Sequence, residues 1–253
     1  MQGHWRCWSL VALVFSAATA QEAEPPGAGP HPVGTTNLRV AVEHDLGDER
    51  MHAILLGQGG SLNDILEHPE AAFIVNVQVP GDSALYGPAS GQALPVVNFI
   101  AYPSAGRDEP NRYRFPYEDG QYGDFEDMLE PGEAPDFADP AARYPLVLLA
   151  HGASAHGLYD VRHAQAIASH GYIVAVLNYA DDRTALSGEA NDHVSFLRPL
   201  LTKAVVDALL ESDTFGPHID ADNIGITGHS FGGFTSLAVS GGRFKGNPAS
   251  VTD

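Results

Sequence analysis

The sequence predicts an α/β fold, in which helices cover a doubly wound, mostly parallel sheet. After Tyr144, short and continuous apolar runs alternate with segments whose apolar residues recur at helical spacing. The resulting order of strand, helix, strand, helix, strand, helix is typical of parallel strands joined by right-handed crossovers. The 253 residues, 44% of them hydrophobic, suit one large globular domain with an N-terminal extension.

The first twenty residues, 1–20, predict a secretory signal peptide. A weakly basic start with Arg6 precedes an apolar stretch from Trp8 to Phe15, and Ala18-Thr19-Ala20 fits an A-x-A cleavage site. The apolar stretch is too short to span a bilayer. We therefore expect a secreted or periplasmic protein that is cut after Ala20, with no membrane span. The alternative is an ordinary buried helix.

Charge and cysteine content exclude several functions. The formal net charge of −19 repels nucleic acid and anionic membrane surfaces, so neither is an expected partner. The single cysteine, Cys7, falls within the predicted signal peptide, which excludes thiol catalysis in the mature protein. Nine acidic residues lie between Glu118 and Asp139 with no Lys or Arg among them. Their spacing does not match a calcium-binding loop, so a solvated acidic loop is favoured over a calcium site.

The N-terminal part divides into two segments. Residues 21–37 are rich in Pro, Gly and Ala and predict a flexible linker. Residues 38–143 predict a β-rich region that ends in a long irregular acidic stretch from Asp108 to Arg143. We favour early strands that lead into the main sheet, over a lid or a separate small domain. The predicted strands are Leu38–Val42, Met51–Leu56, Ala72–Val79 and Leu94–Tyr102.

Residues 144–253 predict the α/β core. Its strands are continuous apolar runs, as expected where both faces of a sheet are covered, and its helices show one apolar face. Pro199 is expected in the first turn of the second helix. The predicted strands are Leu146–Ala150, Tyr172–Leu177 and Ile224–Thr227; the helices are Leu158–His170, Leu197–Leu210 and Phe231–Val239.

The pentapeptide Gly228-His229-Ser230-Phe231-Gly232 fits the pattern G-x-S-x-G. It follows a predicted strand and opens a predicted helix, which is the context of a nucleophile elbow. Such a turn strains the backbone of the serine, and Gly228 and Gly232 avoid side-chain clashes there. The helix N-terminus favours developing negative charge. Ser230 is therefore the candidate nucleophile. The alternative is a glycine-rich turn with an N-capping serine.

A second motif, His151-Gly152-Ala153, directly follows the first strand of the core. Acyl transfer needs two N–H donors aimed at the oxyanion of the tetrahedral intermediate. One should come from Phe231, the residue after the nucleophile, and the other from this earlier loop. We expect the Ala153 N–H to be the second donor, with His151 shaping the loop.

The segments YPLVLLAHGASAHG, IASHGYIVAVLNY and IGITGHSFGG resemble the Ser-dependent branch of the dienelactone-hydrolase-like superfamily of α/β-hydrolases. That branch includes platelet-activating-factor acetylhydrolases and cutinase-like polyester hydrolases. The resemblance covers about Tyr144 to Gly242. Dienelactone hydrolases proper use a cysteine, so Ser230 points to the esterase relatives. The resemblance implies hydrolysis of a small-molecule or polymeric ester, with no cofactor and no metal.

In this superfamily the triad runs serine, acid, histidine along the chain. No histidine follows His229, so we expect the acid, the base and the last strands and helices of the fold beyond Asp253, and the core of 144–253 to be incomplete. Asp253 fits the acid by spacing alone. Alternative bases, in an order foreign to the fold, are His156, His163, His170, His193 and His218, and Asp181 and Asp182 are candidates to line the cleft.

Three functions stay open. The first is ester hydrolysis through Ser230. The second is a non-catalytic binding protein, or an inactive fragment, on a hydrolase scaffold. The third is peptidase or acyltransferase chemistry, since an elbow determines the nucleophile and not the acceptor.

Overall fold

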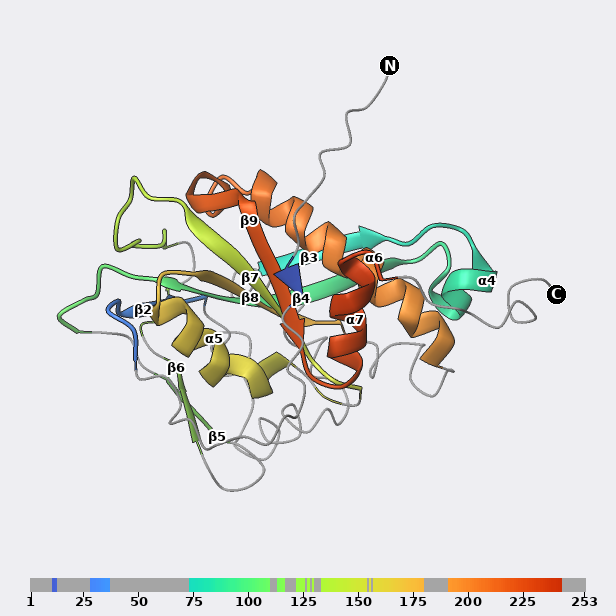
Figure 1. Cartoon of the computed structure of the whole chain (residues 1–253), viewed down its shortest axis with the longest axis horizontal. Coiled ribbons are helices and arrows are strands. Elements are labelled where there is room, and N and C mark those ends of the chain that lie inside the picture. The colour runs from blue at the N-terminus through green and yellow to red at the C-terminus, as the bar shows by residue number, and fades with distance from the viewer. Residues whose placement is uncertain are drawn as a thin grey trace, which may run out of the picture.

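The computed structural model describes residues 11–12, 28–36, 73–109, 113–116, 122–125, 127, 129, 133–153, 155, 157–179 and 191–242. They form a seven-stranded mixed sheet flanked by helices, and a separate two-stranded hairpin (Figure 1). The predicted α/β class is confirmed. The predicted strands 38–42 and 51–56, together with His156, Asp181 and Asp182, lie outside the described residues.

Three parallel strands form the centre of the sheet. They are β7 (Tyr144–Ala150), β8 (Ile173–Asn178) and β9 (Ile219–Gly228), and β7 lies between the other two. Leu146 is aligned with Ile173 on one side and with Ile224 on the other. Their apolar side chains are buried, as the continuous apolar runs predict.

Helical connections join these strands, and the two connections run across the sheet in opposite directions. The 3-10 helix η3 (Gly157–Asp160) and α5 (Val161–Ser169) join β7 to β8. The long helix α6 (Asn191–Glu211) and η4 (Gly216–His218) lead from β8 back across β7 to β9. Because both crossovers in such a sheet are right-handed, α5 and α6 belong on opposite faces. The last helix, α7 (Phe231–Val239), follows β9 directly.

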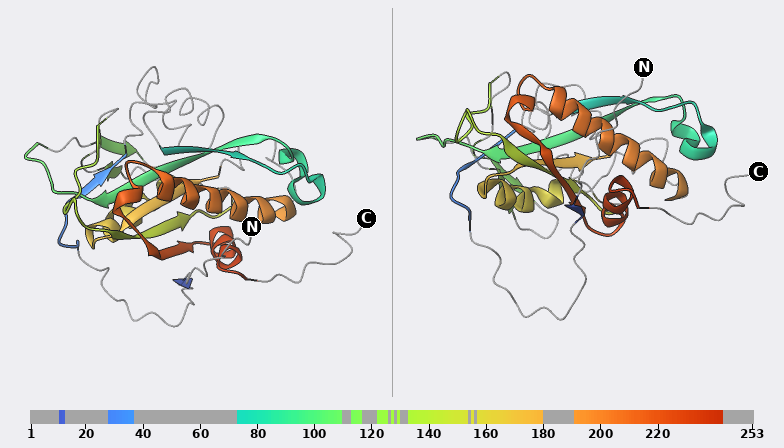
Figure 2. Two further views of the ribbon diagram at one scale, coloured as in Figure 1. Left: turned by 90° about the horizontal axis from the view of Figure 1, so that it is seen from above. Right: turned by 45° about the horizontal axis from the view of Figure 1, so that its top comes forward.

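The N-terminal strands extend the same sheet, as expected. β4 (Ala93–Pro103) pairs antiparallel with β8, and both β2 (Val33–Thr35) and β3 (Phe73–Gln78) pair antiparallel with β4. The connection between β3 and β4 carries α4 (Ser83–Tyr86) and η2 (Gly87–Ala89). This tip lies against α6 (Figure 2). The two-residue strand β1 (Val11–Ala12) runs parallel to β9.

Three features differ from the sequence prediction. Val33 to Thr35, within the segment 21–37 predicted as a linker, form β2 because the side chains of Val33 and Thr35 are buried and the segment pairs with β4. The stretch Asp108–Arg143 contains a hairpin of β5 (Tyr113–Pro116) and β6 (Tyr122–Phe125). Pro199 lies inside α6 and not in its first turn, because the helix begins at Asn191.

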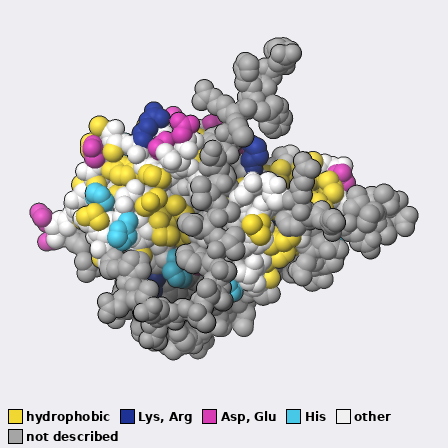
Figure 3. Space-filling model, viewed as in Figure 1, with side chains coloured by type: hydrophobic (Ala, Val, Ile, Leu, Met, Phe, Trp, Pro, Cys, Tyr) yellow, Lys and Arg dark blue, Asp and Glu magenta, His cyan; other side chains and the backbone are white. Residues whose placement is uncertain are grey.

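The described surface combines apolar and charged side chains. Its large exposed apolar side chains are Tyr172, Phe196 and Leu237. Figure 3 shows apolar side chains gathered in patches on the face that it presents. Within the described part of the chain, no helix has both the length and the apolar character needed to cross a membrane.

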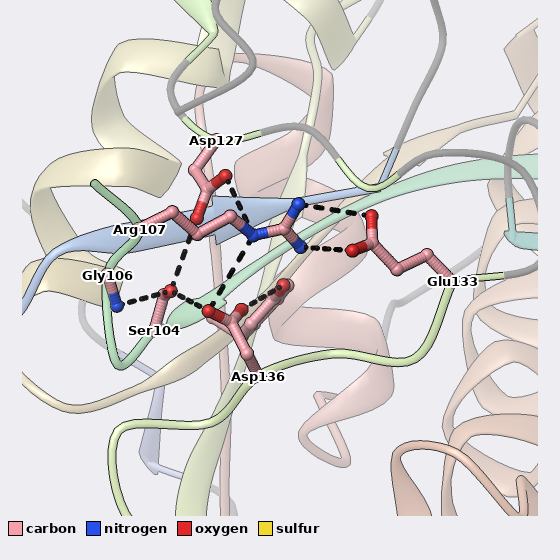
Figure 4. A network of polar contacts seen from close by, with 7 residues as sticks. Ser104, Gly106, Arg107, Asp127, Glu133 and Asp136 are labelled. Carbon is pink, nitrogen blue, oxygen red and sulfur yellow. Dashed lines mark hydrogen bonds and ion pairs between the residues drawn. The ribbon is translucent and has the colours of Figure 1, made fainter. Parts of the chain in front are cut away.

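Part of the acidic stretch is buried and paired, which differs from the expected solvated loop. Figure 4 shows Arg107 among three carboxylates from that stretch. Its Nε lies 3.3 Å from Asp127 Oδ1, and its Nη2 lies 2.8 Å from Glu133 Oε1. Asp127 is buried, whereas Asp136 is half-buried and accepts hydrogen bonds from Ser104 and from Tyr102. Arg107 precedes the acidic stretch in sequence, so this cluster ties the stretch to the end of β4.

Candidate functional site

Ser230 occupies a strained turn between β9 and α7. Its backbone has φ 53° and ψ −118°, and among described non-glycine residues only Asp127 also has a positive φ. Such a conformation costs about 1–3 kcal/mol and persists only where the surrounding structure imposes it. The turn is closed by the Gly232 N–H, which donates to the His229 carbonyl at 2.8 Å. Ser230 is exposed at the turn, so its hydroxyl is accessible to a reactant.

The serine does not act as a helix cap. Its side chain makes no capping hydrogen bond to α7, although it occupies the N-cap position. The Phe234 N–H donates to the Ser230 carbonyl at 3.2 Å, which is the first backbone hydrogen bond of the helix and forms with or without a side-chain cap. An ordinary capping serine would place its oxygen on the N–H of the second or third helical residue. The geometry therefore favours the elbow interpretation over the glycine-rich turn with a cap.

Two glycines let the elbow pack directly on the end of β7. A Cβ atom on Gly232 would lie 1.8 Å from the Ala150 carbonyl oxygen, and one on Gly228 would lie 2.4 Å from that same atom. Both contacts are with backbone, which cannot rotate away. The strand before Ser230 and the helix after it can therefore approach β7 only if both positions are glycine, as the motif predicts.

The loop after β7 lies beside the serine. A Cβ atom on Gly152 would be 3.4 Å from Ser230 Cβ and 3.3 Å from His229 Nδ1. Gly152 is buried, whereas Ala153 is exposed. Because the carboxyl ends of parallel strands share one edge of the sheet, the two sequence motifs meet there. The structure thus brings the predicted loop and the predicted elbow together.

His151 is buried and shapes this loop. Its Nε2 accepts a hydrogen bond from the Tyr179 N–H at 3.4 Å, so the proton of a neutral ring resides on Nδ1. Nδ1 then donates to the Gly152 carbonyl at 2.7 Å. Both ring nitrogens are engaged by backbone groups. His151 therefore suits the predicted role in loop shape and not that of a base.

Arg198 is a member of the site that the sequence analysis missed. This side chain of α6 is buried, with 1% of the residue exposed. Its Nη1 donates to the His151 carbonyl at 2.7 Å, and its Nη2 donates to the Gly152 carbonyl at 3.3 Å. The guanidinium carbon also lies 4.7 Å from the ring centre of Tyr179 and 4.8 Å from that of Phe231. A detectable signal existed, since Arg198 follows Val194 and precedes Leu201 at the spacing of the apolar face.

Two of the alternative bases lie at the wrong edge of the sheet. His170 lies at the end of α5, shortly before β8, and His218 directly precedes β9, so both lie where the parallel strands begin. Ser230 follows the end of β9 and lies at the opposite edge. The topology thus separates these histidines from the candidate nucleophile by the length of a strand.

The other two described candidates lie in elements that begin near the elbow edge, and each has a partner. His163 Nδ1 is 3.3 Å from Asp160 Oδ1, and three quarters of the His163 side chain is exposed. His193 is half-buried, and its Nδ1 donates to the Leu85 carbonyl at 3.2 Å. Neither interaction activates Ser230.

The carboxyl group of Asp160, near the elbow, has a raised pKa. Burial raises the pKa of its carboxyl group above the usual value, while the neighbouring His163 and His229 act in the opposite direction. Among the described residues, no three His, Cys, Asp or Glu side chains are grouped so that they could hold a metal ion.

Comparison with known proteins gives a limited match. No protein-family model matches the chain, and no curated protein matches it. Solved structures do match, among them a ferulic acid esterase from Streptomyces cinnamoneus, at 21% identity and a TM-score of 0.45. The match covers 66% of this chain and 53% of that chain, so this chain spans about half the length of that structure. The strand pairing and the elbow themselves define the class, an α/β protein with a serine at a strained strand–helix turn.

Proposed function

We propose that this protein is a serine hydrolase that cleaves carboxylic esters through an acyl-enzyme on Ser230. The observation that carries the proposal is the exposed Ser230 in a strained elbow, with no capping hydrogen bond and with the Gly152 loop at its side. An elbow of this kind presents a serine hydroxyl to an incoming carbonyl. The resemblance of residues 144–242 to ester hydrolases supports the same reaction.

In the proposed reaction, the Ser230 oxygen adds to the ester carbonyl and loses its proton to a general base. The Phe231 and Ala153 N–H groups stabilise the resulting oxyanion. Collapse of the intermediate expels the alcohol, which takes up the proton, and leaves the acyl group on Ser230. Water then releases the carboxylic acid and restores the hydroxyl.

A fluorophosphonate probe tests the nucleophile. We expect covalent labelling of the full-length protein at Ser230, identified by peptide mass spectrometry, and no labelling of Ser230→Ala. Ser240→Ala is a matched control, because Ser240 lies at the far end of α7 and bonds to the Ser236 carbonyl. An absence of labelling, or labelling that persists in Ser230→Ala, would refute the proposal and favour a non-catalytic binding protein.

Substrate panels separate ester hydrolysis from the related reactions. We expect turnover of p-nitrophenyl esters and little turnover of peptide anilides, because the resemblance is to esterases. Faster cleavage of anilides would indicate a peptidase, and transfer of the acyl group to an added alcohol in preference to water would indicate an acyltransferase.

Export is the second part of the proposal. The signal-peptide pattern of residues 1–20 supports a secreted or periplasmic location. A cut after Ala20 would remove β1 and leave the rest of the sheet described above in place. N-terminal sequencing of the protein from its native source should begin at Gln21, and a sequence that begins at Met1 would contradict it.

A further inference from the structure

We infer that Arg198 is a positioning residue that orients the oxyanion-binding loop and ties it to the elbow. This inference rests on the proposed function, because it assigns a purpose to N–H groups beside Ser230. Arg198 lies on α6, but its guanidinium group reaches backbone carbonyls of two successive residues after β7. It also contacts the ring of Phe231, the residue that follows Ser230.

The geometry of the peptide bond converts these contacts into an orientation of the N–H groups. In a trans peptide, the N–H of one residue points opposite to the carbonyl of the residue before it. Arg198 Nη1 holds the His151 carbonyl at 2.7 Å, so the Gly152 N–H points away from the guanidinium. Arg198 Nη2 and His151 Nδ1 both bond to the Gly152 carbonyl, so the Ala153 N–H points away as well. The Ala153 N–H, the proposed oxyanion donor, is thus oriented by hydrogen bonds to the Gly152 carbonyl on the opposite side of the same peptide bond.

The chemistry of arginine suits this place better than that of lysine. A planar guanidinium presents donors in a rigid fork and can bond two adjacent carbonyls while its flat faces contact aromatic rings. Tyr179 and Phe231 supply those rings, with centres 4.7 and 4.8 Å from the guanidinium carbon. The Tyr179 hydroxyl is held in turn by Thr202, whose own hydroxyl donates to the Arg198 carbonyl at 2.8 Å.

One side chain therefore joins both segments that supply the proposed oxyanion donors. The Gly152–Ala153 loop follows β7 and Phe231 follows β9, and Ala153 and Ser230 are 77 positions apart along the chain. Loss of Arg198 would leave the loop to the His151 side chain, which bonds to the Gly152 carbonyl and to the Tyr179 N–H. Because an oxyanion hole acts only when its donors are already oriented, the reaction step should suffer more than substrate binding.

The test uses Arg198→Met and Arg198→Lys in the full chain. Lys203→Met is the matched control, because Lys203 is on the same helix, is 69% exposed in its side chain and pairs only with Asp207 among the contacts described. The first readout is kcat and KM for a p-nitrophenyl ester, together with the rate of fluorophosphonate labelling. We expect Arg198→Met to lower kcat and the labelling rate by about 10- to 100-fold, somewhat less than removal of an oxyanion donor. KM should change less than about threefold.

The second readout does not depend on activity. Backbone ¹⁵N order parameters of Gly152 and Ala153 should fall from about 0.85, typical of rigid backbone, toward about 0.6 in Arg198→Met, and stay unchanged in Lys203→Met. Arg198→Lys should give intermediate values in both readouts. If the wild-type protein is not labelled, the proposed function fails while the order parameters still decide the orienting role.

Three results would overturn the inference. One is a folded Arg198→Met variant with wild-type order parameters, kcat and labelling rate. The second concerns the case in which Arg198→Met does not fold: the lysine variant then decides, and wild-type values in both readouts would remove the orienting role. Equal losses in Lys203→Met would also contradict it, because they would show a general effect of charge on α6.

Discussion

Gly232→Ala should destabilise the protein strongly, because the elbow has no space for one extra methyl group. The new Cβ would lie 1.8 Å from the Ala150 oxygen, 2.6 Å from the Ala150 carbonyl carbon and 2.8 Å from the His151 oxygen. To reach an ordinary contact of 3.4 Å, the backbones would have to separate by about 1.6 Å. β7 is paired on both sides, so it cannot move without disturbing β8 and β9. We expect a loss of about 3 kcal/mol, the upper end for overpacking.

Other glycines of this chain give a graded series of glycine-to-alanine variants, whose expected losses of stability can be compared with that of Gly232→Ala. Gly228→Ala, with a contact of 2.4 Å to backbone, should cost nearly as much as Gly232→Ala. Gly233→Ala meets only the Gly228 oxygen at 3.3 Å and lies in a helix, where alanine is favoured by about 0.5–1 kcal/mol, so its net effect should be small. Gly81→Ala is the control, because no atom lies within 4 Å of its Cβ position.

Thermal unfolding measures the series. For a chain of this size, 1 kcal/mol corresponds to about 2–4 °C in Tm, so Gly232→Ala should lower Tm by about 6–12 °C. Gly81→Ala should leave Tm unchanged or raise it slightly, through a less flexible unfolded chain. A Gly232→Ala variant with the Tm of Gly81→Ala would refute the reasoning, because the elbow would then not lie against the end of β7.

Three further predictions follow from other contacts. Ser230→Gly should be about 1 kcal/mol more stable than Ser230→Ala, because glycine relieves the strained φ of 53°; equal Tm values for the pair would contradict this. Arg107→Met should cost on the order of 2 kcal/mol in denaturant unfolding, because it leaves the buried Asp127 carboxylate without this cation; a change below 0.5 kcal/mol would count against it. Asp160→Asn should gain stability relative to wild type as pH rises from about 3.8. Burial raises the pKa of Asp160 in the folded protein, so the wild type loses stability as this carboxyl group ionises with rising pH, whereas the asparagine variant does not. Tm values from pH 3 to 5.5 test this, and a gain that shrinks with pH would contradict it.

The parallel half of the fold could be predicted because each element has its own local pattern. The apolar run Leu146–Ala150 is the end of β7, and Phe231–Val239 matches α7 at both bounds. The antiparallel pairing of β4 with β8 could not be predicted in the same way. It joins Ala101 to Val174 across more than seventy residues, and no local pattern specifies a partner at that distance.

Element starts were predicted less well where burial, and not periodicity, decides them. The apolar stripe of α6 indicated a start near Leu197, but Val194 is already buried and the helix begins at Asn191. The short strand β2 lies in a segment rich in Pro and Gly, and its Gly34 packs against the ring of Tyr102. Only the surrounding sheet makes such a segment a strand.

The site shows the same division between local and distant determinants. The elbow is a backbone structure, and its requirement for close approach to the end of β7 appears in the sequence as Gly228 and Gly232. Arg198, in contrast, bonds to two carbonyls and contacts two aromatic rings that are brought together only in the folded protein. Within the sequence it is one arginine on a helix. A charged residue on the buried side of a predicted helix is therefore the pattern to pursue in such sequences, because burial of a guanidinium requires backbone or acidic partners that are themselves part of a constrained site.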